Sequence, residues 1–373
     1  MVLFSSLDST PKVTIFRFRR TLLTSDHHTA TPVDRLPVTM NHDYCNRAPV
    51  FTAVATVARR IERSPQNPKQ HFFVISSTKE FATIAVSDRF ASMPPPPVIL
   101  TIAGFDPSSG AGITADIKTI AAHGCYGIAA ITALTVQSTV GVRQVFPVDP
   151  HLLRDSLEEL TADVKVSTVH IGMLGSGEVA SQVAEFLEGS SPAHVVLDPI
   201  LRASSGTALL DTLGIEILTQ KLLPLATVIT PNVDEAVALT GLEVRDVGQM
   251  RDATQRLHEM GAKGVVITGG HLERAVDFLS LENGGGVQVF RAERLDSKCT
   301  HGTGCAFSTS IACHLAQGRG LSEAVLLAKA YVTAAISSGY PLGKGCSPVN
   351  HMYRLKSHPR AAGLAKRLAS GKD

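Results

Sequence analysis

Short apolar runs alternate with segments of helical spacing from Val98 to about Leu355. The run Val98–Ala103 is almost continuously apolar, which is typical of a strand buried on both faces. We predict further strands at 127–134, 142–148, 169–171, 194–197, 227–229 and 264–267, and helices at 113–122, 150–162, 177–188, 211–221, 232–239, 247–260, 305–317 and 321–338. Two runs joined around Gly284-Gly285, at 276–281 and 286–290, predict an antiparallel hairpin. The pattern therefore predicts an α/β domain with a mostly parallel central sheet, helices on both faces and a small antiparallel edge.

Residues 1–92 do not share this alternation. They hold scattered arginines, isolated prolines and polar clusters, with apolar residues at rough helical spacing only around 51–61. Met93 stands directly before four prolines and the first clear strand. We therefore expect three parts: an extension at 1–92 that is disordered or an artefact of start-codon choice, one domain at 93–355, and a basic C-terminal tail at 356–373.

A chain that begins at Met93 is expected to be soluble and to keep the full activity of the longer chain. The reason is that every predicted element of the domain lies after this residue. Purifying the shortened chain and comparing its activity with that of the full chain tests this. Loss of folding or of activity would show that residues 1–92 are needed.

Composition argues against several classes of partner. The formal net charge is +2, aromatic residues make up 5% and tryptophan is absent, so nucleic acid is not expected as the main partner. No apolar run is long enough to cross a membrane. The six cysteines include no Cys-x-x-Cys pair, which fits a reducing compartment better than a disulfide framework or a zinc site. We expect a cytoplasmic protein without a nucleic-acid or membrane partner.

Most polar and glycine-rich residues of the domain fall in the loops that follow the predicted strands. These loops are 104–112, 135–139, 172–177, 198–206, 230–235, 268–273 and 299–305. In open sheets of this kind, ligands bind beyond the carboxyl ends of the strands. The loops therefore predict one active site at that edge of the sheet.

The stretch Cys299–Cys305 is the strongest candidate among these loops. Gly302 and Gly304 let the backbone approach an anion closely, and the following helix directs its free N–H groups at the loop. Such a place suits the negative charge of a phosphoryl group in transfer. Cys305 lies at the expected helix start, where the pKa of a thiol falls below its usual value of about 8.5. The alternative is a glycine turn that caps a helix, with Cys305 as a small core residue.

Nine stretches together resemble the hydroxymethylpyrimidine/phosphomethylpyrimidine kinases, a branch of the ribokinase-like superfamily. The resemblance covers essentially all of 98–355, and the stretches are Thr101–Gly112, Ala115–Thr119, Ile131–Thr139, Ile171–Leu174, Val196–Pro199, Ile229–Ala236, Gly269–Leu272, Thr300–Cys305 and Gly343–Gly345. It implies a three-layer ribokinase-like fold, a homodimer, and ATP with Mg²⁺ as cofactors. The implied reaction phosphorylates 4-amino-5-hydroxymethyl-2-methylpyrimidine and then its monophosphate, giving the pyrophosphate used in thiamine biosynthesis.

The resemblance implies that Cys305 is the catalytic residue that accepts the proton of the substrate hydroxyl. Most of the superfamily has aspartate at this position, and this branch has cysteine. A thiol with a lowered pKa could take that proton at neutral pH, or the thiol could only position the hydroxyl. The N–H groups around Gly302 and Gly304 would supply most of the rate by stabilising charge on the transferring group.

Four residues match the substrate pocket of the family. Gln137 matches an amide that recognises the pyrimidine, since a carboxamide offers both a donor and an acceptor. Asp116 matches a carboxylate of the pocket, while Gly104 and Met173 match positions that line the ring. The alternatives are a polar residue at a strand end for Gln137, a first-turn acid favoured by the helix dipole for Asp116, and core packing for Met173.

Asn232 and Glu235 form the Asn-x-x-Glu pattern of the superfamily at a predicted helix start. Their oxygens suit Mg²⁺ held mostly through water, with Asp198 adding charge beside the metal. A helix-capping pair is a compatible alternative for the first two, and a turn-forming Asp-Pro is the alternative for Asp198. The resemblance further implies that the nucleotide contacts Asn232, Glu235, Gly269, Gly270 and Thr303.

Two positions depart from the family pattern. Many relatives carry lysine where this chain has Thr268 and Ser204, so affinity for ATP could be lower, or Mg²⁺, Lys298 or Lys344 could take over the charge. Two other functions stay open. The first is a pyridoxal or pyridoxine kinase, alone or as a second activity of the same enzyme. The second is a non-catalytic pyrimidine-binding protein.

Overall fold

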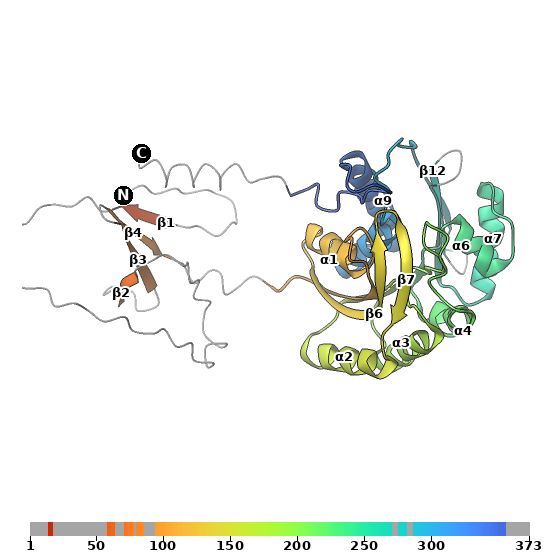
Figure 1. The fold of residues 1–373 in the computed structure, drawn as a ribbon, viewed down its shortest axis with the longest axis horizontal. Coiled ribbons are helices and arrows are strands. Elements are labelled where there is room, and N and C mark those ends of the chain that lie inside the picture. The colour runs from red at the N-terminus through yellow and green to blue at the C-terminus, as the bar shows by residue number, and fades with distance from the viewer. Residues whose placement is uncertain are drawn as a thin grey trace, which may run out of the picture. The chain divides into compact units, whose positions relative to one another are not determined.

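The computed structural model describes residues 14–17, 58–63, 71–77, 80–85, 94–270, 275–281 and 286–355 (Figure 1). The chain divides into two units, Met1–Pro95 and Pro96–Asp373. The predicted basic tail at 356–373 lies outside the described residues, and so does the segment 271–274.

The first unit contains a four-stranded antiparallel sheet. Its order is β1-β4-β3-β2, and its strands are β1 (Thr14–Arg17), β2 (Ala58–Arg63), β3 (His71–Ser77) and β4 (Glu80–Ala85). The helical spacing at 51–61 does not correspond to a helix at residues 58–61, which lie in β2. A short apolar pattern does not distinguish a helix from a strand. That residues 1–92 are dispensable stays a prediction.

The second unit is built on a nine-stranded sheet in the order β13-β12-β11-β10-β9-β8-β5-β6-β7. The strands from β11 to β6 in this order run parallel, whereas β12, β13 and β7 are antiparallel to their neighbours. The strands are β5 (Val98–Phe105), β6 (Tyr126–Ser138), β7 (Gly141–Pro147), β8 (Thr168–Ile171), β9 (Val195–Leu197), β10 (Val228–Ile229), β11 (Gly264–Gly269), β12 (Ala275–Leu281) and β13 (Val287–Ala292).

Helices cover both faces of this sheet, which confirms the predicted three layers (Figure 1). One face is covered by α1 (Gly112–Ala122), α8 (Thr303–Ala316) and α9 (Leu321–Ser337). The other is covered by α2 (Pro150–Asp163), α3 (Gly177–Ser190), α4 (Thr212–Ile217), the π-helical turn η3 (Leu218–Leu222), α5 (Leu223–Leu225), α6 (Val233–Thr240) and α7 (Val247–Glu259). Among the described residues, no helix is both long and apolar enough to span a membrane.

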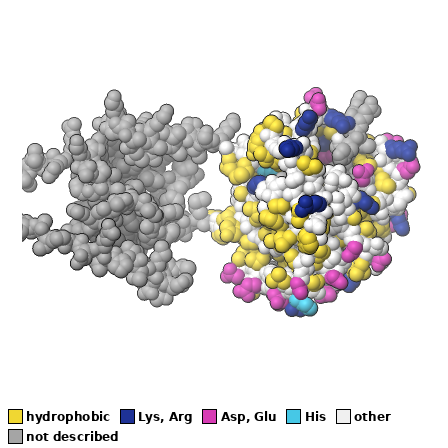
Figure 2. Space-filling view, in the orientation of Figure 1, with side chains coloured by type: hydrophobic (Ala, Val, Ile, Leu, Met, Phe, Trp, Pro, Cys, Tyr) yellow, Lys and Arg dark blue, Asp and Glu magenta, His cyan; other side chains and the backbone are white. Residues whose placement is uncertain are grey.

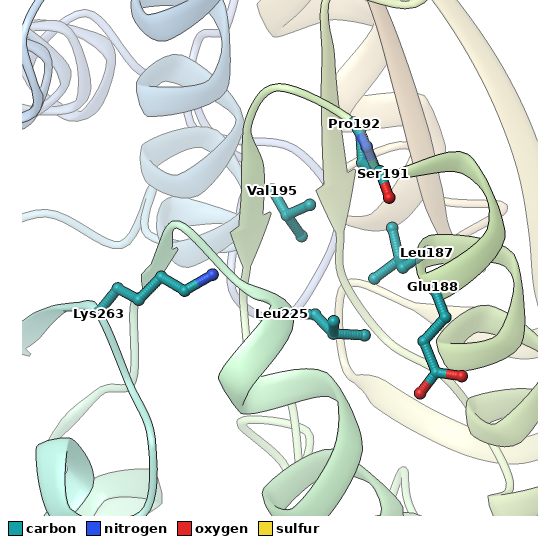
Figure 3. A pocket seen from close by; sticks show the side chains of 7 residues that line it. All are labelled: Leu187, Glu188, Ser191, Pro192, Val195, Leu225 and Lys263. Atoms are coloured by element: carbon teal, nitrogen blue, oxygen red, sulfur yellow. The ribbon is translucent and has the colours of Figure 1, made fainter.

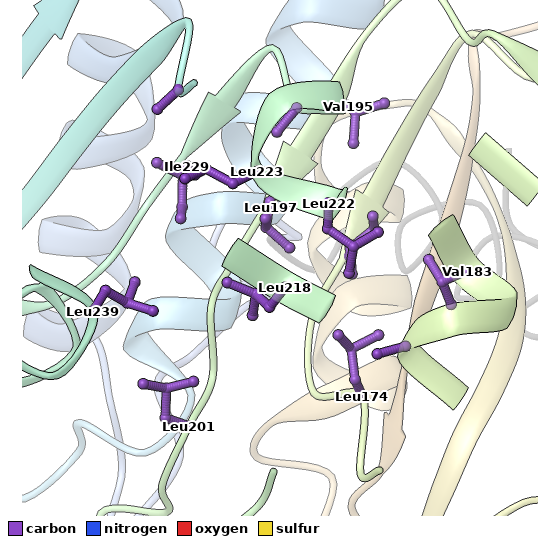
Figure 4. Packing of buried hydrophobic residues seen from close by; sticks show 14 of the residues in the cluster. Leu174, Val183, Val195, Leu197, Leu201, Leu218, Leu222, Leu223, Ile229 and Leu239 are labelled. Atoms are coloured by element: carbon purple, nitrogen blue, oxygen red, sulfur yellow. The ribbon is translucent and has the colours of Figure 1, made fainter. Parts of the chain in front are cut away.

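Successive side chains of the central strands enter two different cores. In β9, Val195 and Leu197 pack on the side of α3, whereas Val196 packs on the side of α8. Figure 4 shows the first core, where Leu197 lies with Leu218 and Leu222. Each fully buried aliphatic side chain of this kind contributes about 1.5–3 kcal/mol, so burial on both faces holds the strand ends in place.

The edge formed by β6 and β7 differs from the prediction. Only two residues join these strands, which is too short for the crossover that parallel neighbours need, so β7 returns antiparallel. The hairpin extends β6 to Ser138, beyond the predicted end at 134. Leu134, Val136 and Phe146 remain exposed on it, with Leu134 opposite Phe146. Figure 2 shows apolar side chains gathered over this part of the surface.

A hollow of about 360 Å³ lies away from the carboxyl ends of the strands. Figure 3 shows it beside Val195, the first residue of β9, and Lys263, which precedes β11. The hollow is therefore at the amino-terminal edge of the sheet, opposite the edge where the predicted site residues lie. Its lining residues are Leu187, Glu188, Ser191, Pro192, Val195, Leu225 and Lys263.

Candidate active site

The described parts of the predicted loops meet at the carboxyl edge of the parallel strands. The loop after β5 contacts the turn before α8, and Met173, which follows β8, contacts Gly104 at the end of β5. The ends of β10 and β11 are joined by the N–H of Thr268, which donates to the carbonyl of Pro231 at 2.9 Å. Asp198, after β9, lies beside Gly304 at the start of α8. One continuous site results, with α8 pointing its N-terminus into it.

The turn at the start of α8 provides the anion-binding geometry. The helix begins at Thr303, two residues earlier than predicted, and Gly302 is its N-cap with φ of 79°, in the left-handed region. The N–H of Thr303 donates to the carbonyl of Thr300 at 3.3 Å. Among the described residues, the N–H groups of Gly304 and Cys305 have no acceptor. Those two groups, with the positive end of the helix dipole, are what an anion would meet.

Two glycines bring the turn into direct contact with the loop after β5. A Cβ on Gly302 would overlap the carbonyl oxygen of Gly110, and a Cβ on Gly110 would overlap the ring of His301. The close approach therefore requires glycine at both positions. At Gly302 the two loops meet through backbone atoms, and at Gly110 the backbone lies against the ring of His301.

Asp106 fastens this contact with its carboxylate. Its Oδ2 lies 2.9 Å from His301 Nε2 and accepts from the N–H groups of Ala111 and Gly110, at 2.9 and 3.1 Å, while Oδ1 accepts from the N–H of Ser108 at 2.8 Å. Burial alone raises the pKa of Asp106, but the hydrogen bonds from His301, Ser108 and Ala111 outweigh burial and lower it. The carboxylate is therefore ionised at neutral pH.

Replacing Asp106 with asparagine is expected to lower the free energy of unfolding by about 1–3 kcal/mol, because the amide keeps one acceptor oxygen and turns a donor toward N–H groups. Urea unfolding measures the loss. Asp149 is the control, since it caps the exposed start of α2 by accepting from the N–H of His151. Asparagine caps as well as aspartate, so Asp149→Asn should change stability by less than about 0.5 kcal/mol. Equal losses in the two variants would contradict the fastening role.

Cys305 is a buried residue in the first turn of α8. Burial raises the pKa of its thiol well above the usual value, and the charges of Asp116 and Asp198 raise it further, against one backbone hydrogen bond from Gly112. The predicted lowering of this pKa is therefore wrong. The helix N-terminus favours the thiolate, but loss of water and the nearby carboxylates outweigh it. The thiol is neutral near pH 7.

Gln137, Gly104 and Met173 lie on one side of this turn. Gln137 is part of β6, and its Nε2 lies 3.4 Å from Nε2 of His301. A Cβ on Gly104 would lie 2.9 Å from the sulfur of Met173, so the two are neighbours. Met173 is also buried against Ala133, as its core-packing alternative required. The structure therefore brings together three of the four residues predicted for the substrate pocket.

Asp116 is the fourth, and it does not join them. It is fully buried in α1, where its two oxygens accept from the hydroxyls of Thr101 at 2.7 Å and Thr309 at 2.9 Å. Because α1 begins at Gly112, Asp116 is also too far along the helix to be a first-turn acid. The carboxylate lies between the sheet and α8, so direct contact with a substrate does not fit its position.

Asn232, Glu235 and Asp198 lie on the other side of the turn. Asn232 and Glu235 form a capping box at the start of α6, with both hydrogen bonds at 2.9 Å. Burial, and then the charge of Asp198, raise the pKa of Glu235 to about 8, and burial raises the pKa of Asp198 to about 6. Two buried carboxyl groups that resist ionisation fit a place that a cation would stabilise. No group of three potential ligands is arranged for direct coordination in the part of the chain that the structure describes.

Glu235 is expected to make the protein less stable as pH rises. Its folded-state pKa is about 8 against an ordinary value of 4.5, so between these values the folded protein binds more protons than the unfolded chain. Stability therefore falls with rising pH over this range. Glu235→Gln can keep the N-cap hydrogen bond and should remove this part of the fall, as melting temperatures across the range would show.

The exposed neighbour Asp234 provides the control for this prediction. Asp234→Asn removes one charge from the same helix turn without removing a buried carboxyl group. Its melting temperature should keep the pH dependence of the unchanged protein. If Glu235→Gln also kept that dependence, Glu235 would not be its source.

The other residues predicted to contact the nucleotide are Gly269, Gly270 and Thr303. Gly269 is buried at the end of β11, and Gly270 is exposed with open space beside it. Asn232 is bridged to Thr268, so these glycines adjoin the start of α6. The hydroxyl of Thr303 donates to the carbonyl of Thr300 at 2.7 Å, which leaves its oxygen free to accept. The nucleotide roles of these residues stay predictions.

The sequence motifs alone indicated no role for Asp106 or His301, although both residues lie in the stretches that carry the family resemblance. The available signal was an aspartate before Ser-Ser-Gly in one loop and a histidine before Gly-Thr-Gly in another. Asp106 and His301 are 195 residues apart in the chain, so their pairing cannot be read from the spacing of the motifs. Only the fold brings them together.

A three-layer α/β fold with an anion-binding turn at its strand-end edge defines a small-molecule kinase of the ribokinase-like class. Residues 106–350 match the family model described as phosphomethylpyrimidine kinase. The hydroxymethylpyrimidine/phosphomethylpyrimidine kinase of Streptomyces coelicolor is 42% identical over 268 residues, which cover 71% of this chain and 98% of the relative. The chain therefore belongs to the phosphomethylpyrimidine kinase family.

The chain is also 43% identical over 254 residues to the thiamine biosynthesis bifunctional protein ThiED of Geobacter sulfurreducens. These residues cover 68% of this chain and 52% of that protein, so the chain spans about half the length of this relative. The similarity therefore concerns one part of a bifunctional protein.

Solved structures confirm the ribokinase-like fold. A pyridoxal kinase of Bacillus subtilis in complex with ADP has a TM-score of 0.65 at 36% identity, covering 70% of this chain and all of that one. The phosphomethylpyrimidine kinase of Clostridium difficile has a TM-score of 0.58 at 38% identity, covering 64% and 99%. A pyridoxal kinase of Staphylococcus aureus, in complex with AMP-PCP and pyridoxal, has a TM-score of 0.63 at 30% identity, covering 70% and 95%.

Proposed function

We propose that the protein transfers the γ-phosphoryl group of ATP to the hydroxymethyl group of 4-amino-5-hydroxymethyl-2-methylpyrimidine, and a second phosphoryl group to the monophosphate. The product is the pyrophosphate used in thiamine biosynthesis. The observation that carries the proposal is the turn at the start of α8, where two N–H groups lack an acceptor among the described residues beside the buried thiol of Cys305. Membership of the phosphomethylpyrimidine kinase family supports the choice of substrate.

In the proposed reaction, the substrate oxygen bonds to the γ-phosphorus while the bond from that phosphorus to the leaving oxygen of ADP breaks. The N–H groups of Gly304 and Cys305 stabilise the charge that spreads over the transferring group. Because the Cys305 thiol is neutral near pH 7, its assigned role is to position the substrate hydroxyl. In a loose transition state, the hydroxyl proton leaves only after the new bond has begun to form, and it passes to a phosphoryl oxygen or to water. Gln137 binds the aminopyrimidine edge, with Gly104 and Met173 against the ring.

The acidic side of the site fits Mg²⁺ held mainly through water. The observation behind this is the raised pKa of Glu235 and Asp198, whose ionised forms a cation would stabilise. When bound, the metal ion would neutralise charge on the phosphates of ATP. Asn232, Glu235 and Asp198 would hold its water ligands, and the nucleotide would also contact Gly269, Gly270 and Thr303.

An assay that couples ADP release to a visible signal tests the proposed function. With ATP and Mg²⁺ present, the pyrimidine alcohol and its monophosphate should each cause release of ADP. Binding of the pyrimidine without ADP release would instead support a non-catalytic pyrimidine-binding protein. Omitting the pyrimidine controls for hydrolysis of ATP by water.

Pyridoxal is the second candidate substrate, because solved pyridoxal kinases share this fold at 30–36% identity. We expect the specificity constant for the pyrimidine alcohol to exceed that for pyridoxal. Measuring both substrates with the same preparation decides the question. A higher specificity constant for pyridoxal would overturn the proposed function and leave the kinase class intact.

We also propose that the protein is a cytoplasmic homodimer, as the family resemblance implies. The exposed apolar surface of Leu134, Val136 and Phe146 supports the dimer, since larger exposed apolar patches on soluble proteins often mark interaction surfaces. Light scattering coupled to gel filtration should give twice the mass of the chain. Fractionation of cells with an antibody against the protein tests its location.

A further inference from the structure

A chain of buried polar side chains runs between the sheet and α8, below the anion-binding turn. His170 lies at its centre, in β8, and is fully buried. Its Nδ1 lies 3.2 Å from the Thr101 hydroxyl and 3.5 Å from Asp116, and its Nε2 lies 2.9 Å from the Ser308 hydroxyl. Ser308 in turn lies 3.2 Å from Oδ2 of Asp198. His170 thus stands between the carboxylate within α1 and the carboxylate at the proposed metal side.

Packing alone does not account for a histidine at position 170. Its neighbours Val169 and Ile171 enter the opposite core, so His170 faces α8 from a strand otherwise suited to apolar side chains. Burying an imidazole is unfavourable unless its nitrogens are hydrogen-bonded, and a well-packed apolar residue often stabilises as well or better. Both ring nitrogens of His170 have partners. The hydrogen bonds therefore fix the orientation of the His170 ring, which burial alone would not do.

The geometry that it fixes is that of the anion-binding turn. The Ser308 hydroxyl lies 3.1 Å from the carbonyl oxygen of Gly304 and 3.2 Å from that of Cys305, the two residues whose N–H groups face the site. When Nε2–H of His170 donates to this hydroxyl, the single hydroxyl proton remains for Asp198 or for the carbonyls of Gly304 and Cys305, and the carboxylate is the strongest of these acceptors. The hydrogen bond from Ser308 then ties Asp198 to α8, the helix that begins at the anion-binding turn.

We propose that His170 is a positioning residue for phosphoryl transfer, which acts through Ser308 to fix the Asp198 carboxylate beside the N-terminus of α8. The inference rests on the proposed function, because it concerns the same site. His170 touches neither substrate nor phosphate in this account. Its effect is to hold one acidic group and one helix turn in a single arrangement.

The chain supplies a matched control within the same helix. His123, at the C-terminal end of α1, is also buried, and its Nε2 lies 2.9 Å from the hydroxyl of Ser310. The histidine–serine distance is the same as that between His170 and Ser308, and both serines are fully buried in α8. Only the pair of His170 and Ser308 continues to a carboxylate of the site, Asp198. A merely structural loss should therefore be similar for the two pairs.

The experiment compares His170→Leu with His123→Leu, and Ser308→Ala with Ser310→Ala in case a leucine variant does not fold. Steady-state kinetics give kcat and KM, calorimetry gives the Kd for AMP-PCP with Mg²⁺, and urea unfolding gives stability.

His170→Leu and Ser308→Ala should each lower kcat by about 10–100-fold and weaken binding of AMP-PCP with Mg²⁺. Loss of a group that hydrogen-bonds a metal-site residue has an effect of this size in other proteins. KM for the pyrimidine should change by less than about 3-fold, since its pocket is untouched. The two control variants should match their counterparts in stability and leave kcat unchanged.

His170→Gln adds a test that stability alone cannot mimic, because its side-chain amide can still donate to Ser308. It should recover part of the lost kcat and nucleotide affinity relative to His170→Leu. The inference is overturned if His170→Leu and Ser308→Ala lower kcat and affinity no more than the controls do. If the unchanged protein does not phosphorylate the pyrimidine, the proposed function fails, while the calorimetry still decides whether His170 shapes the nucleotide site.

Discussion

Replacing Gly302 with alanine is expected to lower kcat by at least about 100-fold, the scale of loss that follows a displacement of about 1 Å in a catalytic group. Two effects act together at this position. Gly302 has φ of 79°, which an alanine adopts with strain, and an added Cβ would overlap the carbonyl oxygen of Gly110. The loop and the start of α8 must therefore separate. That movement shifts the N–H groups of Gly304 and Cys305 away from the phosphoryl group that they are proposed to stabilise.

Gly318 provides the control at the other end of the same helix. Its φ is 81°, close to that of Gly302, but an added Cβ would meet open space. Gly318→Ala should therefore lower stability by about 1–2 kcal/mol through the backbone strain alone and leave kcat unchanged. Steady-state kinetics with urea unfolding on both variants separates strain from displacement. Unchanged kcat in Gly302→Ala would remove the turn from the proposed mechanism.

Replacing Cys305 with alanine is expected to lower kcat by about 100-fold, the lower end of what a general base or its hydrogen-bonding equivalent contributes. The structure separates two reasons for this loss. A thiolate base requires ionisation, which burial and the charges of Asp116 and Asp198 oppose by raising the pKa of the thiol. A positioning thiol requires only a hydrogen bond. Cys305→Ser keeps a hydrogen-bonding group and should therefore retain more activity than Cys305→Ala.

The pH dependence of kcat distinguishes the two roles of Cys305. With a positioning thiol, kcat should not follow the ionisation of Cys305, because the neutral form is the working one. If the thiolate is the base, kcat should keep rising into alkaline solution, and Cys305→Ser should be as inactive as Cys305→Ala. The exposed Cys346 offers a reference for alkylation, since a thiolate at Cys305 would react with iodoacetamide while a neutral buried thiol would not.

The sheet could be predicted from the sequence because its central strands are buried on both faces. Val98–Phe105 and Gly264–Gly269 are apolar runs bounded by turn-forming residues, and such runs have few other interpretations in a chain with intervening helices. The sequence pattern did not indicate the direction of β7. The pattern marked a strand after β6 but did not reveal that β6 continues to Ser138 and leaves only a two-residue turn.

The chemical part of the site was harder to predict than its location. Motif stretches placed Cys305, Gln137 and Glu235 at the correct edge, because each follows a predicted strand, although Gln137 lies within β6 itself. The pKa of Cys305 depends on Asp116 and Asp198, which lie far from it in the chain and meet it only in the folded protein. Asp116 was misplaced for a related reason. The sequence put it in a helix, but its burial under α8 depends on contact with Thr309, 193 residues away.

The backbone contact between Gly110 and Gly302 has a consequence for exchanging parts between related enzymes. Because the two loops meet through backbone at Gly302 and through the contact of Asp106 with His301, neither loop can change its path without the other. A graft of 299–305 from a pyridoxal kinase should therefore misfold locally unless 104–112 is grafted with it. The smallest transferable piece of this site is thus a pair of loops drawn from opposite ends of the domain.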